Sequence, residues 1–293
     1  MSVAKINGLS IGYDIIGEGR PWSITPGGRF SRETGGVREL AERIAEGGNK
    51  VLIWDRPNCG ESDVYFEGDT ESSMQADTLA QLLRELGMTP AVITGGSGGS
   101  RVSLLTAARH RDVAKGLAMW WISGGITGLL GLGKHYCNGS ARAAWAGGME
   151  AVVALPEWEE VLEKNPANRE RFLALDPKQF VADMERWMLA YCPCGDSLIP
   201  GLPDAEARKF DLPTLVFRSG ASDLSHTRKT SEDLAALLPN ARLVEPPWGD
   251  GEWNERSSRP APRGEGLFVG WPNLAPALLD WAQDTLFDRS SPR

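Results

Sequence analysis

Short apolar runs alternate with amphipathic segments along most of this chain. Consecutive apolar residues, as in VLIW at 51–54 and AVIT at 91–94, are typical of strands buried on both faces of a sheet. Between such runs, apolar positions recur at helical spacing, for example Val37, Leu40 and Ile44 ahead of a glycine stop. This alternation predicts βαβ units, and hence an α/β fold with a mostly parallel sheet and helices on both faces.

The alternation stops for one long stretch. Between 126 and 208 several short helical patterns follow one another with no strand pattern between them. Strand and helix patterns resume afterwards and continue to NLAPALLDWAQDTLF near the C-terminus. We therefore expect an α/β core formed by residues 1–125 and 209–293, with residues 126–208 inserted as a helical cap.

Composition and charge narrow the class of protein. The 293 residues are 41% hydrophobic and 24% charged, which suits one large globular domain carrying an insertion. A net charge of −8 disfavours nucleic acid and anionic membrane surfaces as partners. The N-terminus lacks a signal-peptide pattern, and no apolar run approaches the roughly 18 residues of a membrane span, so a cytoplasmic protein is expected. The four cysteines are interpreted as ordinary thiols.

One serine is surrounded by glycines at a predicted junction between a strand and a helix. In VITGGSGGSRVSLL, Gly95, Ser97 and Gly99 form a Gly-x-Ser-x-Gly pattern. A nucleophile at such a turn needs strained backbone angles and small neighbours, so that its hydroxyl stands clear of the sheet. The helix start presents unpaired N–H groups, and that of Gly98 is a candidate oxyanion donor. A tightly packed or phosphate-binding turn is the alternative, but the P-loop lysine and the dinucleotide spacing are absent, and no cofactor is expected.

At these residues the chain resembles the α/β-hydrolase fold family, and the resemblance covers nearly its whole length. VITGGSGGS looks like the nucleophile elbow, ITPGGR like the loop that supplies an oxyanion donor, WDRPNCGESD like a family Asp-x-x-x-x-Gly-x-Ser segment, and FRSGASD like the strand carrying the triad acid. The resemblance implies Ser97 as nucleophile, Asp223 as acid, and an oxyanion hole from Gly98 N–H with that of Gly28 or Arg29.

The sequence departs from the family pattern at the catalytic base. The segment that should carry the histidine reads EPPWGDGEWNER, with Glu252 in its place. Of the three histidines, His110 ends the helix after the serine and His135 falls in the cap, whereas His226 follows Asp223 by three residues. Two candidates for the base therefore remain, His226 and Glu252. A carboxylate could serve if Glu252 and Asp223 competed for one proton in an apolar pocket, which would raise one apparent pKa.

Several side chains are candidates for binding the ligand. Arg29 and Arg101 lie close in sequence to the oxyanion loop and the serine, and either could orient an anionic group. His135 and Trp145 lie in the cap, and Trp253 flanks the acidic loop that contains Glu252. A pocket lined by such rings fits a small apolar or aromatic molecule.

These features favour a cofactor-free serine hydrolase with an atypical base, acting on an ester, a lactone or a C–C bond of a small substrate. Two other classes remain open. One is a lyase, isomerase or decarboxylase that uses the same fold without an acyl-enzyme, and the other is a small-molecule receptor without turnover. A homodimer is compatible with the sequence, and no metal site is expected.

Overall fold

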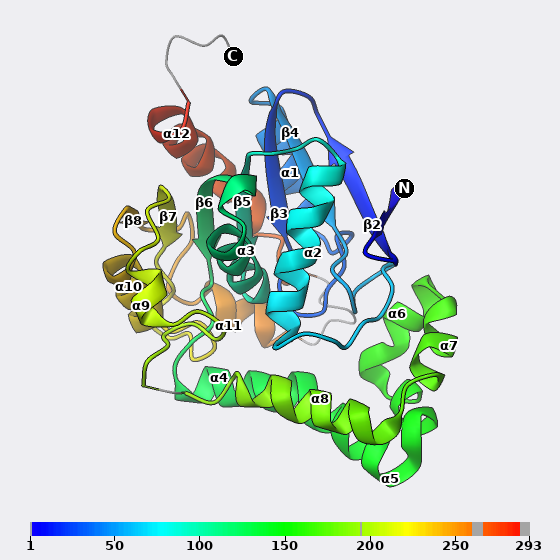
Figure 1. The fold of residues 1–293 in the computed structure, drawn as a ribbon. Helices are drawn as coiled ribbons and strands as arrows, with labels where there is room; N and C mark the ends of the chain where they lie inside the picture. Colours follow the sequence, from blue (N-terminus) through cyan, green and yellow to red (C-terminus); the bar gives the residue numbers. More distant parts are fainter. Residues whose placement is uncertain (1, 194, 260–265, 288–293) are drawn as a thin grey trace.

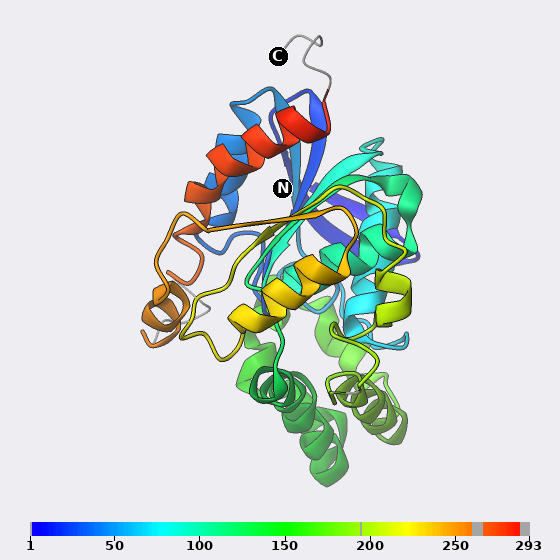
Figure 2. The ribbon, with the colours of Figure 1, turned by 90° about the vertical axis from the view of Figure 1, so that its left-hand side faces the viewer.

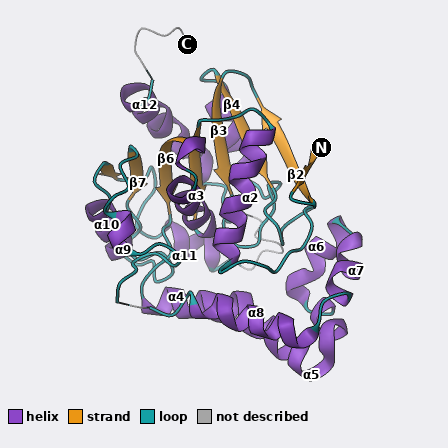
Figure 3. Ribbon diagram, in the orientation of Figure 1, coloured by secondary structure: helices purple, strands orange, loops and turns teal. Residues whose placement is uncertain are grey.

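A single sheet of eight strands forms the centre of the computed structural model, which describes residues 2–193, 195–259 and 266–287 (Figure 3). Its strand order is β1-β2-β4-β3-β5-β6-β7-β8. Strand β2 runs antiparallel to β1 and β4, and the remaining pairs are parallel. The strands are β1 (Ser2–Ile6), β2 (Leu9–Ile16), β3 (Arg20–Thr25), β4 (Asn49–Trp54), β5 (Ala91–Gly96), β6 (Ala114–Trp120), β7 (Thr214–Phe217) and β8 (Ala241–Val244).

Helices cover both faces of the sheet (Figure 2). Apolar side chains of α1 (Val37–Ala45) and α12 (Ala275–Thr285) share one buried cluster with the sheet. On the other face, α2 (Glu71–Glu85), α3 (Gly98–Arg109) and α10 (Arg228–Leu237) share a second cluster. Every residue of β5 is buried, which explains why the central strands read as continuous apolar runs.

Between β6 and β7 the described residues form helices joined by turns and loops, and no strand apart from one isolated bridge between Ile199 and Leu202. Figure 1 shows α4, α5 and α8 lying together across one end of the sheet. The cap has its own apolar cluster, which Phe66 of the core joins. The helices of this segment are α4 (Ile126–Gly133), the π-helical η2 (Lys134–Asn138), α5 (Gly139–Val153), η3 (Pro156–Trp158), α6 (Glu159–Lys164), α7 (Ala167–Leu173), α8 (Pro177–Leu189) and α9 (Asp204–Ala207).

The acidic segment after the last strand differs from the loop that the sequence suggested. It forms a short helix, α11 (Glu252–Ser257), so Glu252 is a helical residue. Two further 3-10 turns among the described residues are η1 (Arg111–Val113) and η5 (Trp271–Leu274). The sequence did not indicate this helix for two reasons. Its six residues are too few to show a periodic pattern, and glycine and proline occur in the surrounding sequence.

Candidate active site

Ser97 occupies the sharp turn between β5 and α3, with φ of 56° and ψ of −125°. Its glycine neighbours are required by close backbone packing. A methyl group added at Gly95 would lie 2.4 Å from the Gly99 carbonyl oxygen, and one added at Gly99 would lie 2.1 Å from that of Thr25. Only glycine fits such contacts, so these glycines let α3 start directly beside β3 and leave the serine at the tip of the turn.

Ser97, His226 and Asp223 form a continuous chain of hydrogen bonds. Ser97 Oγ lies 2.8 Å from His226 Nε2, and His226 Nδ1 lies 2.9 Å from Asp223 Oδ2. Because an ionised carboxylate only accepts hydrogen bonds, Nδ1–H donates to Asp223, which leaves Nε2 of the neutral ring to accept from the serine hydroxyl. This arrangement allows proton transfer from Ser97 to His226.

The loop after β7 holds the acid and the imidazole together. Asp223 Oδ1 accepts hydrogen bonds from the backbone N–H groups of Ser225 and His226, each 2.8 Å long. Its second oxygen is thereby directed to the His226 ring. Both side chains are buried, so water does not compete for these bonds. One carboxylate therefore fixes both the backbone and the ring of the histidine.

Two tryptophans enclose the imidazole. The Trp253 ring meets that of His226 edge to face, with centroids 4.4 Å apart, and Trp121 lies nearly parallel to it at 6.0 Å. Trp121 itself has a positive φ of 49°, which places its indole next to the site directly after β6. These rings restrict the orientation of the imidazole and exclude water around it.

Glu252 does not take part in this chain of hydrogen bonds. Its Oε1 accepts from Arg256 Nε at 2.9 Å, one turn along α11. No contact between Glu252 and Asp223 or Ser97 is found among the described residues. The shared proton between two carboxylates that the sequence allowed therefore has no counterpart here, and the group in contact with the serine is His226.

Candidate oxyanion donors face each other across the elbow. Gly28 has φ of +53°, and a methyl group added at Gly98 would lie 3.3 Å from the Gly28 amide nitrogen. Arg56 donates to the carbonyl oxygens of Gly27 and Gly28 at 3.1 and 2.7 Å, which fixes the loop. The Arg29 side chain turns toward Glu71, 3.3 Å away, and is used in that ion pair. The ion pair leaves the backbone N–H of Arg29 as a candidate donor, while the Gly28 amide nitrogen is the one that lies beside Gly98.

A cavity of about 470 Å³ opens above Ser97. Its walls come from the oxyanion loop, from α4 and η2 of the cap, from α11 and from the segment before η5. Two of the ligand-binding candidates, His135 and Trp253, belong to it. The lining residues are Gly28, Phe30, Ser97, Leu132, His135, Tyr136, Ser225, His226, Trp253, Arg256, Ser257, Arg259, Leu267 and Phe268.

The other two ligand-binding candidates are not brought to this cavity. Trp145 is 80% exposed and borders a different hollow on the cap, because its face of α5 points away from the core. Arg101 is buried and donates to Ser72 Oγ at 2.8 Å and to the Tyr191 hydroxyl at 3.0 Å. Its guanidinium joins the core to the end of α8 instead of lining the site.

Sequence reasoning did not select Tyr136, Phe30, Phe268 or Trp121, which all border or support the site. Tyr136 follows His135 directly, and its hydroxyl oxygen is 3.8 Å from the position of a methyl group added at Gly98. Burial raises the pKa of Tyr136, although Arg101 and Arg56 oppose the shift. The phenol therefore stays protonated and able to donate near neutral pH. No motif marks such residues, because only the packing of the cap brings them to the serine.

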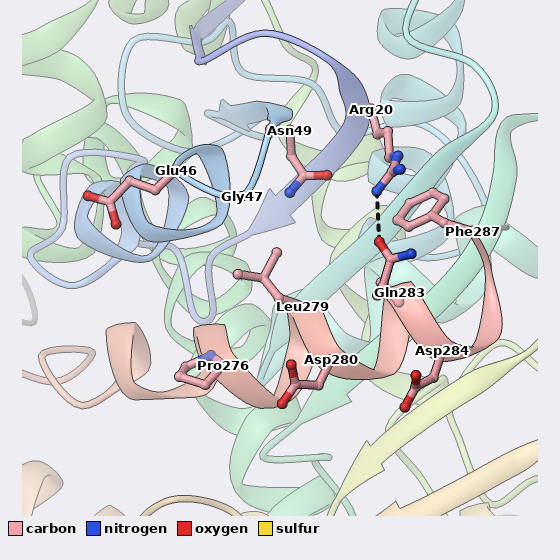
Figure 4. A pocket seen from close by; sticks show the side chains of 12 residues that line it. Arg20, Glu46, Gly47, Asn49, Pro276, Leu279, Asp280, Gln283, Asp284 and Phe287 are labelled. Atoms are coloured by element: carbon pink, nitrogen blue, oxygen red, sulfur yellow. Dashed lines mark hydrogen bonds between the residues drawn. The ribbon is translucent and has the colours of Figure 1, made fainter. Parts of the chain in front are cut away.

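A larger cavity of about 690 Å³ lies at the other end of the strands. Arg20 and Asn49, which begin β3 and β4, line it together with α12, and Arg20 donates to Gln283 at 3.1 Å there (Figure 4). Ligands of open α/β sheets bind beyond the carboxyl ends of the strands, where Ser97 lies. The cavity above the serine is therefore the better candidate site.

The remaining sequence expectations concern thiols, metals and membranes. Cys59 and Cys137 are buried, and burial raises the pKa of each thiol to about 12, whereas Cys194 lies outside the described residues. Within 2–193, 195–259 and 266–287, no cluster of three or more His, Cys, Asp or Glu side chains is suited to a metal ion. Over the same ranges, no helix has the length and apolar character to cross a bilayer.

The mostly parallel eight-stranded sheet with helices on both faces is that of the α/β-hydrolase fold, and comparison with solved structures confirms it. A thermophilic esterase from Thermogutta terrifontis has a TM-score of 0.63 and 19% identity, covering 98% of this chain and all (100%) of its own. The enol-lactonase from Burkholderia xenovorans LB400 has a TM-score of 0.60 and 20% identity, covering 96% and 100% of the two chains. The meta-cleavage product hydrolase from Pseudomonas fluorescens IP01 has a TM-score of 0.62 and 16% identity, covering 97% and 98%.

Comparison of sequences alone matches a smaller part of the chain than comparison of structures does. No protein-family model matches the chain. A protein of Mycobacterium phage D29, provisionally named a non-heme haloperoxidase, is 30% identical over 109 residues, or 37% of this chain. The match spans 38% of the phage protein. The comparisons therefore confirm the predicted fold. The reaction has to be inferred from the geometry of the candidate site.

Proposed function

We propose that this protein is a cofactor-free serine hydrolase that cleaves an ester or lactone of a small substrate. The hydrogen-bond chain from Ser97 through His226 to Asp223 carries this proposal, since it supplies a nucleophile, a base and a group that orients the base. The esterase and the enol-lactonase among the solved structures of this fold support the choice of reaction. The base is atypical in position, because it shares a loop with the acid.

In the first half of the reaction, Ser97 Oγ attacks the carbonyl carbon while His226 Nε2 takes the hydroxyl proton. The negative charge that develops on the carbonyl oxygen is stabilised by the amides of Gly28 and Gly98. The bond to the leaving oxygen then breaks, and the proton passes from His226 to the alcohol. Asp223 orients the imidazolium throughout and does not itself take the proton.

In the second half, water attacks the acyl-enzyme ester while His226 takes one of its protons. Collapse of the second tetrahedral intermediate releases the carboxylic acid and returns the His226 proton to Ser97 Oγ. No electrons are exchanged, and water is the only co-reactant. A lactone follows the same steps, with its alcohol and acid ends released as one molecule.

Active-site labelling tests the proposal. A fluorophosphonate probe should add one equivalent to the wild-type protein, detected by intact mass, and none to Ser97→Ala. His226→Gln should label about 10²- to 10⁴-fold more slowly, the usual contribution of general base catalysis. Glu252→Gln is the matched control and should label at the wild-type rate.

Two results would contradict the proposed reaction. The first is a folded wild-type protein that takes up no probe, which would favour a receptor or a lyase without an acyl-enzyme. The second is equal labelling of wild type and His226→Gln together with a slow Glu252→Gln, which would transfer the base to α11. Circular dichroism of each variant confirms that it is folded.

A further inference from the structure

The charged residues that line the cavity above Ser97 are of one sign, apart from the histidines. Among the described residues that line it, Arg256 and Arg259 are the charged ones, and none is Asp or Glu. The whole chain, by contrast, has a net charge of −8. A cavity lined by basic side chains in an acidic protein attracts anions and repels cations.

Both arginines have guanidinium N–H groups for which no partner is found among the described residues. Arg256 is partly buried on α11 and uses Nε for its bond with Glu252, so its two terminal nitrogens remain available in the described part of the chain. Arg259 is exposed, and no ion pair is found for it among the described residues. Its backbone N–H donates to the Arg256 carbonyl at 3.3 Å, which keeps the two residues on the same turn.

Glu252 offsets part of this charge, and His135 does not add to it. Glu252 neutralises one guanidinium, so the cluster of Glu252, Arg256 and Arg259 keeps one excess positive charge. His135 also lines the cavity, and partial burial and the nearby Arg29 lower its pKa. It is therefore neutral at pH 7, when an unperturbed histidine is already mostly neutral.

Apolar side chains form another part of the cavity lining. Phe30, Leu132 and Phe268 line the cavity together with Leu267. A ligand that contacts both the serine and the arginines also has these apolar side chains beside it, which suits a short apolar chain between a carbonyl group and an anionic end. A guanidinium fork matches a carboxylate through paired, charge-assisted N–H donors, whereas a neutral ester group of the same size accepts a weaker hydrogen bond and carries no charge.

We infer that the substrate carries a carboxylate at the end remote from the bond that is cleaved, and that Arg256 and Arg259 bind it. This rests on the proposed function for the identity of the reacting bond. The substrate class is thus a half-ester of a short dicarboxylic acid, or a lactone with a carboxylate side chain.

A matched pair of substrates tests this inference. The para-nitrophenyl monoester of glutaric acid carries the carboxylate, and the methyl ester of the same compound has the same chain without the charge. We expect wild-type kcat/KM to favour the charged ester by about tenfold, and the preference to fall to about one in Arg256→Gln/Arg259→Gln. Arg242→Gln, which removes an exposed arginine of β8, is the control and should keep the preference.

A binding measurement separates failure of this inference from failure of the proposed reaction. In the Ser97→Ala background, calorimetric titration with the charged ester should give a Kd about tenfold higher once both arginines are replaced by glutamine. Equal Kd values, or a wild type that hydrolyses both esters equally well, would overturn the inference. Absence of hydrolysis with a Kd that still depends on the arginines would instead overturn the reaction and leave the anion site standing.

Discussion

At the scale of single residues, the acid and the base of the candidate site lie close together in one short loop. The base follows the acid by three positions, and the Asp223 carboxylate accepts hydrogen bonds from both the backbone and the ring of His226. The indoles of Trp121 and Trp253 then hold the ring from two sides. Asp223, Trp121 and Trp253 therefore fix the His226 ring, and the ring in turn is hydrogen-bonded to the Ser97 hydroxyl. Restricted in this way, the hydroxyl and the imidazole keep a geometry suited to proton transfer.

Tyr136 is the residue whose role is most open to test. Its hydroxyl lies near Gly98 and is kept protonated by burial, so it can donate to the developing oxyanion. We expect Tyr136→Phe to lower kcat about 10- to 100-fold with a smaller effect on KM, because the bond would form mainly in the transition state. Steady-state kinetics on a neutral ester measure this. Tyr65→Phe, whose hydroxyl donates to surface Glu67, is the control, and an unchanged kcat for Tyr136→Phe would exclude the role.

At the scale of elements, the elbow depends on how closely α3 approaches the strands beneath it. Gly99 packs against the carbonyl oxygens of Thr25 and Pro26, at 2.1 and 2.5 Å from an added methyl group, whereas Gly98 has no neighbour closer than 3.3 Å. Gly96 is equally restricted, by the indole of Trp120. The consecutive glycines of GGSGG therefore have separate roles, and those facing backbone are needed for the fold itself.

This difference predicts unequal effects of two similar substitutions. Gly99→Ala should lower the free energy of unfolding by about 1–3 kcal/mol, the usual cost of overpacking, because a backbone carbonyl cannot move aside. Gly98→Ala should cost clearly less stability, since its methyl group would face the more open side toward Gly28. Urea unfolding of the two variants gives the comparison. Equal losses of stability in the two variants would show that the close contact between Gly99 and the end of β3 does not determine the cost of the substitution.

At the scale of the whole molecule, charged side chains connect the cap to the core. Lys164 of α6 pairs with Glu33, and Arg171 of α7 lies 2.7 Å from Asp63. The bond with Lys164 lowers the pKa of Glu33 below its usual 4.5, and the pKa of Lys164 is raised by Glu33 even though burial acts in the opposite direction. The ion pair between the cap and the core is therefore intact at pH values where Glu33 is ionised and Lys164 is protonated.

The pH dependence of this attachment can be measured. Because the folded pKa of Glu33 is lowered, its contribution is fully present above 4.5 and is lost as the pH falls through the folded value. We expect Glu33→Gln to speed proteolysis within the cap at pH 7, and the difference from wild type to shrink progressively below pH 4.5. Glu150→Gln, which breaks a pair with Arg169 inside the cap, should leave the connection unchanged. A difference that persists undiminished in acid would contradict this account.

Most of the core fold was predictable because its signals are local. Strands such as β5 are apolar at every pleat, and helices such as α1 repeat their apolar residues along one face, so short windows of sequence suffice. The exception, α11, has six residues and no buried side chain, and therefore no periodic pattern. The serine turn was equally accessible, since the need for glycine arises from backbone contacts that accompany any strand-to-helix turn of this kind.

The sequence by itself determined the α/β architecture and the strand-to-helix turn at Ser97, because periodicity and glycine sterics act over a few residues. Only the tertiary structure decided which group reaches the serine. His226 is 129 residues from Ser97, and Glu252 had an equally plausible place in the sequence until α11 turned its carboxylate toward Arg256. The same holds for Trp145, which faces solvent, and for Arg256 and Arg259, which line the cavity. Contacts between distant segments depend on how whole elements pack, and no local pattern encodes that.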